Sequence, residues 1–191
     1  SISYKKILKT SIPLFLGSSA LLIMNWIDTL MIGYYLSENE VGSYNIVSKI
    51  SLVPTILLVG VNGVIASQIS SLYKSKNIVS LKKVIKNASK IVLFGSLPIF
   101  LIILCYSEEL FYLFDLNAVY LNKTLIILLV GQFFNIYAGS EVIILQMTGY
   151  QKLFCKIASI AMIFNVVMNF ILIDYYGING AAITTALSPV S

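Results

Sequence analysis

The chain has 191 residues, of which 58% are hydrophobic and 11% are charged, and its formal net charge is +5. Soluble domains carry about 25% charged residues, so this composition excludes an ordinary soluble domain and indicates an integral membrane protein. All the basic residues are lysines and histidine is absent, which removes the arginine fork, the usual proton relay and the commonest metal ligand.

A membrane-spanning helix needs about 20 mainly apolar residues, and several segments of the chain meet this requirement. Because no basic leader with a short apolar core and a cleavage site precedes the first segment, we expect that segment to be a mature span. We also expect both ends of the chain to be cuts in a longer protein. The predicted spans are residues 13–36, 41–73, 84–106, 121–147 and 153–173, followed by a truncated sixth at 181–191.

The first two predicted spans each contain one charged residue, Asp28 and Lys49. The polar residues 37–40 are expected to form the turn of an antiparallel helical hairpin, and Asp28 and Lys49 are equally far from its centre. A lone charge at the middle of a spanning helix costs about 2.5–3.5 kcal/mol, so it normally faces a partner or a wet cavity. We therefore expect Asp28 and Lys49 to pair, either as part of a substrate cavity or as a structural ion pair.

The second predicted span is too long for a straight crossing, because its helix would extend for about 50 Å. We expect it to tilt, to bend near Pro54 and Gly60, or to project from the bilayer. Pro98 marks a second candidate kink, in the third span.

Lysines gather on the side of the predicted bundle that includes the N-terminal segment, and acidic residues gather on the other side. The positive-inside rule then places the lysine side in the cytoplasm. The two cysteines, Cys105 and Cys155, are expected near opposite faces, where they cannot form a disulfide within one chain. The lysine side carries Lys5, Lys6, Lys9, Lys74, Lys76, Lys82, Lys83, Lys86, Lys90, Lys152 and Lys156. The other side carries Glu38, Glu40, Glu108, Glu109, Asp115 and Asp174 against Lys123 alone.

The stretch before the third span is amphipathic. Lys82, Lys86 and Lys90 recur at four-residue intervals, while the apolar residues between them follow a helical spacing. We expect this stretch to lie along the inner leaflet, where it would anchor to anionic lipid headgroups or recognise an anionic substrate headgroup.

Amide side chains recur at membrane depth in the second, fourth and fifth predicted spans. Asn165 and Asn169 are four residues apart and therefore share one helix face. Such amides either join helices by hydrogen bonds or line a cavity. The candidate substrate-cavity residues are Asp28, Lys49, Asn25, Trp26, Asn62, Gln132, Asn135, Glu141, Asn165 and Asn169.

Enzyme chemistry needs convergent nucleophiles, bases or metal ligands, and the sequence offers none of these sets. It also has no glycine-rich phosphate loop, so direct use of ATP by this segment is not expected. We therefore expect a protein that is not an enzyme, with no cofactor and no metal site. A bundle with a few buried polar groups and several bends is typical of a carrier with alternating access.

Six short motifs follow one another along the chain. They are IPLFL at 12–16, IDTLMIG at 27–33, VGSY at 41–44, MTG at 147–149, the pair Asn165 and Asn169, and YGINGAA at 176–182. In this order they resemble the second half of polysaccharide flippases of the multidrug, oligosaccharidyl-lipid and polysaccharide exporter superfamily. The resemblance implies an all-α fold, in which this chain is the C-terminal six-helix lobe of a two-lobe transporter.

The resemblance also implies a substrate, although the chain departs from the family pattern at two positions. Such proteins export lipid-linked oligosaccharide units across the bacterial inner membrane. Trp26 stands where many relatives have an arginine, and Glu141 where they have a small or apolar residue. Glu141 is expected to pair with Lys152 or Lys156 or to line the cavity, and Lys49 matches a position that is often basic in the family.

Three hypotheses follow. The first is a flippase for a lipid-linked oligosaccharide, the second a cation-coupled drug exporter in which Asp28 or Glu141 carries the coupling ion, and the third a membrane scaffold that assembles a polysaccharide synthesis complex. The expected partners are the lipid-linked substrate, membrane lipids, the N-terminal lobe of the same protein, and a polysaccharide polymerase or glycosyltransferases, but no nucleic acid. The expected location is the inner membrane, with the N-terminal end of the chain cytoplasmic.

Overall fold

The computed structural model describes residues 4–116 and 118–188, and in these ranges the chain is helical with no strand. This confirms the predicted all-α class. Five of the helical segments are long and apolar enough to cross a membrane. The elements are α1 (Tyr4–Tyr35), α2 (Glu38–Leu52), the 3-10 turn η1 (Val53–Thr55), α3 (Ile56–Lys74), α4 (Ile78–Cys105), α5 (Ser107–Leu113), α6 (Ala118–Ala138), α7 (Glu141–Met147), α8 (Gln151–Tyr176) and α9 (Ile178–Leu187).

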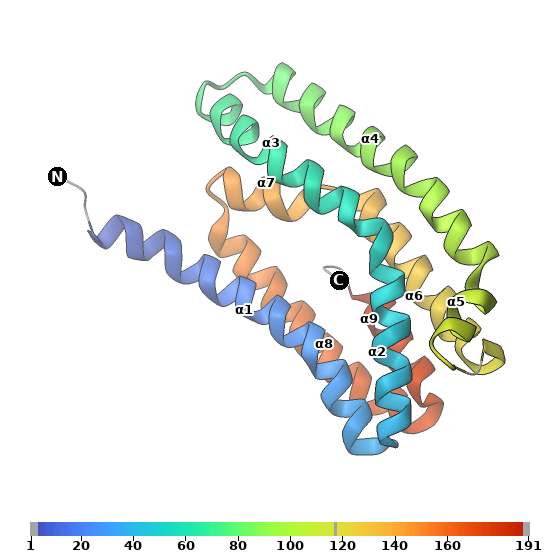
Figure 1. Cartoon of the computed structure of the whole chain (residues 1–191). Coiled ribbons are helices and arrows are strands. Elements are labelled where there is room, and N and C mark those ends of the chain that lie inside the picture. The colour runs from blue at the N-terminus through green and yellow to red at the C-terminus, as the bar shows by residue number, and fades with distance from the viewer. Residues whose placement is uncertain (1–3, 117, 189–191) are drawn as a thin grey trace.

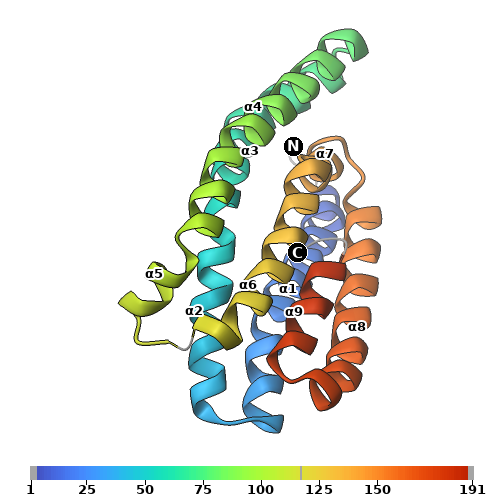
Figure 2. The same ribbon diagram turned by 90° about the vertical axis from the view of Figure 1, so that its right-hand side faces the viewer.

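The helices form a bundle with one projecting hairpin. α1 packs along α8, and α9 lies against both α6 and α8, so the two ends of the described chain meet in one group of helices (Figure 1). α2 packs against α6 and continues through η1 into α3. α3 and α4 run side by side as a hairpin whose tip extends beyond the rest of the bundle (Figure 2).

The α1–α2 turn is shorter than the sequence predicted. Ser37 and Glu40 hold each other through the backbone N–H and the hydroxyl of Ser37, which lie 3.1 and 3.0 Å from Glu40 Oε2. These hydrogen bonds make residues 38–40 the first turn of α2 rather than a loop. The centre of the hairpin therefore moves toward the N-terminus, and the residue of α2 that faces Asp28 changes accordingly.

The predicted bend in the second span is confirmed. η1 interrupts the helical segment at Val53–Thr55, where Pro54 cannot donate a backbone hydrogen bond. Pro98, in contrast, lies inside α4, which is one continuous helix in the structure.

The predicted fourth span, 121–147, is wrong as a single helix, because the chain breaks between α6 and α7. Gly139 has a φ of 73°, a value that a residue with a side chain rarely adopts. The Ser140 hydroxyl donates a hydrogen bond of 2.5 Å to Asn62 Oδ1 of α3, which fixes the break against the neighbouring hairpin.

The lysine-rich stretch before the third span forms the first turns of α4 rather than a separate interfacial helix. Leu81 and Ala88 are buried, and they pack with Ile65 and Ile69 of α3. The stretch therefore belongs to the α3–α4 hairpin, and its position along the inner leaflet stays a prediction.

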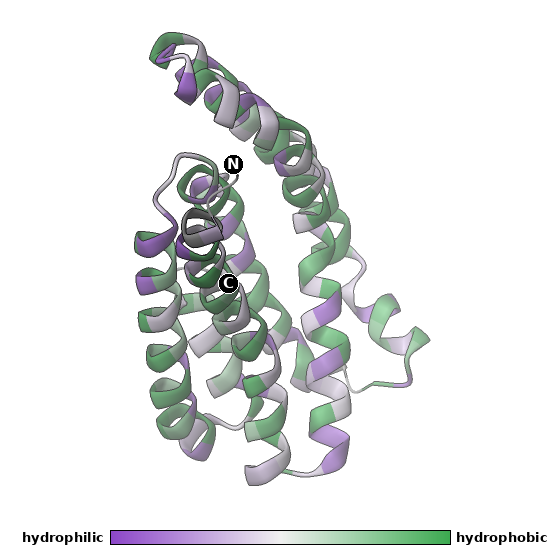
Figure 3. Cartoon of the chain, turned by 90° about the vertical axis from the view of Figure 1, so that its left-hand side faces the viewer, coloured by the Kyte–Doolittle hydropathy of each residue, from purple (hydrophilic) through white to green (hydrophobic). Residues whose placement is uncertain are grey.

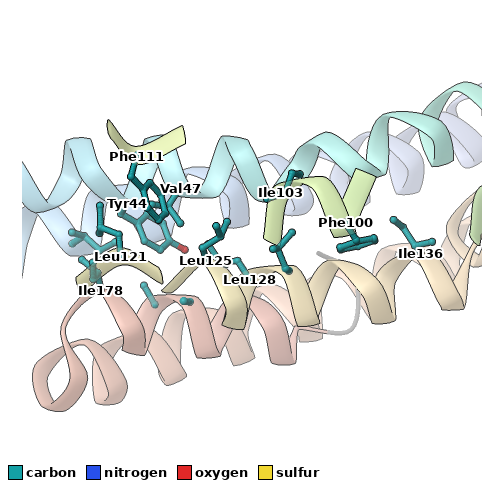
Figure 4. Close-up of a cluster of buried hydrophobic side chains, with 14 of the residues drawn as sticks. Tyr44, Val47, Phe100, Ile103, Phe111, Leu121, Leu125, Leu128, Ile136 and Ile178 are labelled. Carbon is teal, nitrogen blue, oxygen red and sulfur yellow. The ribbon is translucent and has the colours of Figure 1, made fainter. Parts of the chain in front are cut away.

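Most of the apolar core lies where α2, α4 and α6 meet. Figure 4 shows the ring of Tyr44 within this cluster, beside Val47 and Leu125. The α8–α9 turn is packed so closely that a Cβ on Gly180 would overlap the backbone of Leu172. Such dense packing transmits small shifts between helices, because no void is available to absorb them.

Charges divide between the two ends of the bundle. The N-terminal end of α1, the α3–α4 tip and the α7–α8 connection lie at one end, whereas the α1–α2 and α8–α9 turns lie at the other (Figure 2). The tip of the hairpin is hydrophilic and the middle of the helices is largely hydrophobic (Figure 3). The lysine-bearing and acid-bearing segments thus occupy opposite ends, and the cytoplasmic side of the lysine end stays a prediction.

Candidate functional site

The carboxylate of Asp28 is buried inside the bundle. Its residue is 6% exposed, and it lies on the same face of α1 as the buried Met24 and Ile32, four residues before and after it. This face packs against α8. Asp28 is thus an ionisable residue on an otherwise apolar face of α1, at the contact between α1 and α8.

Three neutral donors from three other helices bind the Asp28 carboxylate. Asn169 Nδ2 of α8 lies 2.5 Å from Oδ1. The hydroxyls of Thr185 in α9 and Tyr44 in α2 lie 2.5 and 3.2 Å from Oδ2. We call Asp28, Tyr44, Asn165, Asn169 and Thr185 the carboxylate cluster, and it ties α1, α2, α8 and α9 together.

The asparagine pair predicted to share a helix face belongs to this cluster. Asn169 Nδ2 also lies 3.2 Å from Asn165 Oδ1, and Asn165 Nδ2 lies 3.4 Å from Ser188 Oγ. Asn169 Oδ1 is buried and has no hydrogen-bond partner among residues 4–116 and 118–188. A buried acceptor without a donor costs about 1–3 kcal/mol, so an unmet acceptor beside a carboxylate indicates a site for a positively charged or proton-donating group.

The predicted Asp28–Lys49 pair is wrong. Asp28 accepts hydrogen bonds from the neutral side chains of Tyr44, Asn169 and Thr185, whereas Lys49 is exposed. The short α1–α2 turn is the reason, because it brings Tyr44 opposite Asp28. A hydrogen bond of 3.2 Å between Thr29 and Asn45 shows that the next residue of α1 contacts this turn of α2 as well.

The carboxylate cluster has the chemistry of a small cation or proton site. Around Asp28 lie the amide oxygens of Asn165 and Asn169 and the hydroxyl of Thr185, and that hydroxyl also donates to the carbonyl of Ala181 over 3.0 Å. Hard oxygen donors of this kind suit a hard cation. No basic side chain neutralises Asp28 within the ranges that the structure describes, so one positive charge would complete the cluster.

A second polar group lines a cavity of about 180 Å³ between α1, α3, α6, α7 and α8. Three of the predicted cavity residues, Asn62, Asn135 and Glu141, contribute to its lining. Gln132 joins them, because its Oε1 accepts a hydrogen bond of 3.2 Å from Asn135 Nδ2. The α6–α7 break thus borders a pocket whose mainly apolar lining includes a few polar side chains, among them Glu141.

The other predicted site residues lie on the surface of the bundle. Asn25 and Trp26 are exposed on α1, and Asn25 Nδ2 donates only to the carbonyl of Leu21, 3.1 Å away. Neither belongs to the carboxylate cluster or to the α6–α7 pocket. Lys49 is likewise exposed, on α2.

Three residues of the candidate site were not predicted from the sequence: Tyr44, Thr185 and Ser140. Tyr44 was missed because the predicted centre of the α1–α2 hairpin was about two residues too far along the chain. A hairpin centred two residues earlier places Tyr44 opposite Asp28. Thr185 lies in the last apolar segment, where its spacing of 16 from Asn169 carries no recognisable signal. Ser140 follows Gly139, and the Gly-Ser step was the available sign of a helix break.

Within the described residues, the helical bundle holds a buried carboxylate bound by neutral side chains and, at the α6–α7 break, a pocket with several polar side chains, which is the architecture of a membrane transporter. The family model MatE matches residues 13–171, and the chain belongs to this family. It is also 28% identical over 167 residues to the "Probable low-salt glycan biosynthesis flippase Agl15" of Haloferax volcanii.

The match to that relative covers 86% of this chain and 35% of the relative, so the chain spans about a third of its length. No solved structure matches the chain. The family and the relative confirm the resemblance to flippases of the exporter superfamily that the sequence motifs indicated.

Proposed function

We propose that this chain is one lobe of a flippase that moves a lipid-linked oligosaccharide across the plasma membrane. The observation that carries the proposal is the carboxylate cluster, in which Asp28 is held by neutral donors from three other helices. A cation that binds there draws α1, α2, α8 and α9 together, and its loss frees them. Exchange of that cation would therefore couple an ion gradient to helix movement.

Membership of the MatE family supports export, and the name of the Haloferax relative supports a glycan-linked cargo. A lipid-linked oligosaccharide carries phosphate, which needs a positive counter-charge when it leaves water. Lys49 supplies such a charge, since it is exposed on α2 and does not pair with Asp28. The two charges thus take separate roles: Lys49 contacts the substrate and Asp28 holds the coupling cation.

The proposal is tested by restoring surface glycan in cells that lack their own flippase, with the full-length protein. Lys49→Gln should reduce restoration at least tenfold, and Lys49→Arg should retain part of it. Lys123→Gln is the matched control, because it removes one lysine from α6 at the opposite end from the lysine-rich tip. Membrane abundance is measured for each variant. Full restoration by Lys49→Gln at normal abundance would overturn this role.

A cation-coupled drug exporter is the second candidate, and the carboxylate cluster and Glu141 favour it, because a cation-coupled drug exporter needs a carboxylate for its ion. In that case Asp28→Asn and Glu141→Gln would abolish drug resistance while Lys49→Gln has little effect. Drug susceptibility and surface glycan measured on the same variants separate the two functions. A non-transporting scaffold would instead support glycan assembly with every one of these variants.

A further inference from the structure

A groove of about 370 Å³ runs along the outer face of the α3–α4 hairpin. Because the two helices are antiparallel, Gly60 and Ile91 lie at the end nearer the middle of the bundle and Gln68 and Val84 at the end nearer the tip. The nine lining residues are Gly60, Val61, Val64, Ile65, Gln68, Val84, Asn87, Ala88 and Ile91.

The groove changes character along its length. Its inner part is lined by apolar side chains and by Gly60, where an added Cβ would meet nothing within 4 Å. Toward the tip, Gln68 and Asn87 add amide groups that can hydrogen-bond an ester or a hydroxyl. The groove therefore fits a molecule with an apolar chain and a polar head, oriented with the head toward the hairpin tip.

Positive charge flanks the groove along α4, from Lys83 beside Val84 at the tip end to Lys90 beside Ile91 at the inner end. Lys83 and Lys90 precede and follow Asn87 by four and three residues, which places them on its side of α4. Both lysines are exposed, and no acidic residue occurs between Glu40 and Glu108. A basic groove rim at the end of two spanning helices attracts anionic headgroups.

We infer that this groove binds one anionic phospholipid, with an acyl chain beside Gly60 and the phosphate between Lys83 and Lys90. The groove lies apart from the transport pocket: on α3, Asn62 faces the α6–α7 break through Ser140, whereas the groove residues occupy the other side of the helix. The lipid would hold the projecting hairpin in the membrane independently of the cargo.

The predicted position of the acyl chain is tested by filling the groove with a side chain. Gly60→Leu adds a side chain to the groove at a position where a Cβ meets nothing within 4 Å, and Gly63→Leu is the matched control, since a Cβ on Gly63 also meets open space but Gly63 does not line the groove. Binding of phosphatidylglycerol and of phosphatidylcholine to the full-length protein in detergent is counted by native mass spectrometry. Gly60→Leu should lower phosphatidylglycerol binding at least fivefold, and Gly63→Leu should not change it.

The predicted binding of the phosphate by Lys83 and Lys90 is tested with two double variants, each of which removes two positive charges. Lys83→Gln with Lys90→Gln should weaken phosphatidylglycerol binding by about fivefold per lysine, whereas Lys82→Gln with Lys86→Gln should weaken it less. Equal binding of phosphatidylcholine, or equal loss in both double variants, would overturn the inference. So would preferential binding of undecaprenyl phosphate to this groove, or a groove blocked in the full-length protein by another segment of the same chain.

Discussion

Asn169 of α8 donates a hydrogen bond of 2.5 Å to Asp28 of α1, although the two residues are 141 positions apart in the sequence. The same carboxylate accepts from Tyr44 and Thr185, so four helices depend on one buried group. A carboxylate of this kind is stable at membrane depth only when its charge is compensated, either by a proton or by a bound cation. The structure thus connects the ionic state of Asp28 to the packing of half the bundle.

Energetic coupling should follow the observed contacts of Asp28 rather than the predicted ion pair. In a double-mutant cycle for the free energy of unfolding in mixed detergent micelles, Asp28→Asn and Tyr44→Phe should couple by more than about 0.5 kcal/mol. Tyr44→Phe alone should cost about 1.5–3 kcal/mol, because it removes a hydrogen bond to a charged group. The effects of Asp28→Asn and Lys49→Gln on the free energy of unfolding should be additive. Coupling between these two substitutions would instead support an Asp28–Lys49 ion pair.

The charge asymmetry predicts the labelling of the two cysteines. Cys105 ends α4 beside the acidic α5 and is exposed, whereas Cys155 lies in the first turns of α8 between Lys152 and Lys156. In intact cells, an impermeant maleimide should label a variant that keeps only Cys105 and should spare one that keeps only Cys155. Permeabilised cells provide the control for reactivity. Labelling of Cys155 from outside the cell would contradict the predicted orientation and indicate the opposite one.

The α8–α9 turn should tolerate no side chain at Gly180. Gly180→Ala would force its Cβ into the carbonyl group of Leu172, so we expect a loss of several degrees in the temperature of thermal unfolding or a protein that does not accumulate. Gly63→Ala is the control: it meets open space in the middle of α3 and should stabilise the protein by about 0.5–1 kcal/mol. Equal thermal stability of the two variants would refute the close packing of α9.

The sequence predicted the helical class and the polar residues better than it predicted their partners. Asp28, Asn165 and Asn169 meet in the carboxylate cluster, and Asn62, Asn135 and Glu141 line one pocket. Hydropathy and helical spacing are local properties, so they indicate which residues are buried and which share a face. Packing between distant segments decides which helices those faces contact. No local sequence pattern indicated that α1 packs against α8.

Two errors came from the chemistry of turns. The Ser37–Glu40 capping pair extended α2 toward the N-terminus and shifted the α1–α2 register away from Lys49. Gly139 and Ser140 divided a segment that is apolar enough to be read as one span. Both signals are visible in the sequence as a Ser-x-x-Glu box and a Gly-Ser step, but uninterrupted hydropathy outweighed them.

Whether a cation held at Asp28 drives export can be measured in proteoliposomes that contain the full-length protein and a fluorescent lipid-linked oligosaccharide. The measured quantity is the rate at which the fluorescent headgroup becomes accessible to a membrane-impermeant quencher, with and without a sodium or proton gradient. We expect gradient-dependent transport by the unmodified protein and at least a tenfold loss with Asp28→Asn, while Glu141→Gln keeps its gradient dependence. Transport by a folded Asp28→Asn variant at the normal rate and with the normal gradient dependence would contradict this expectation.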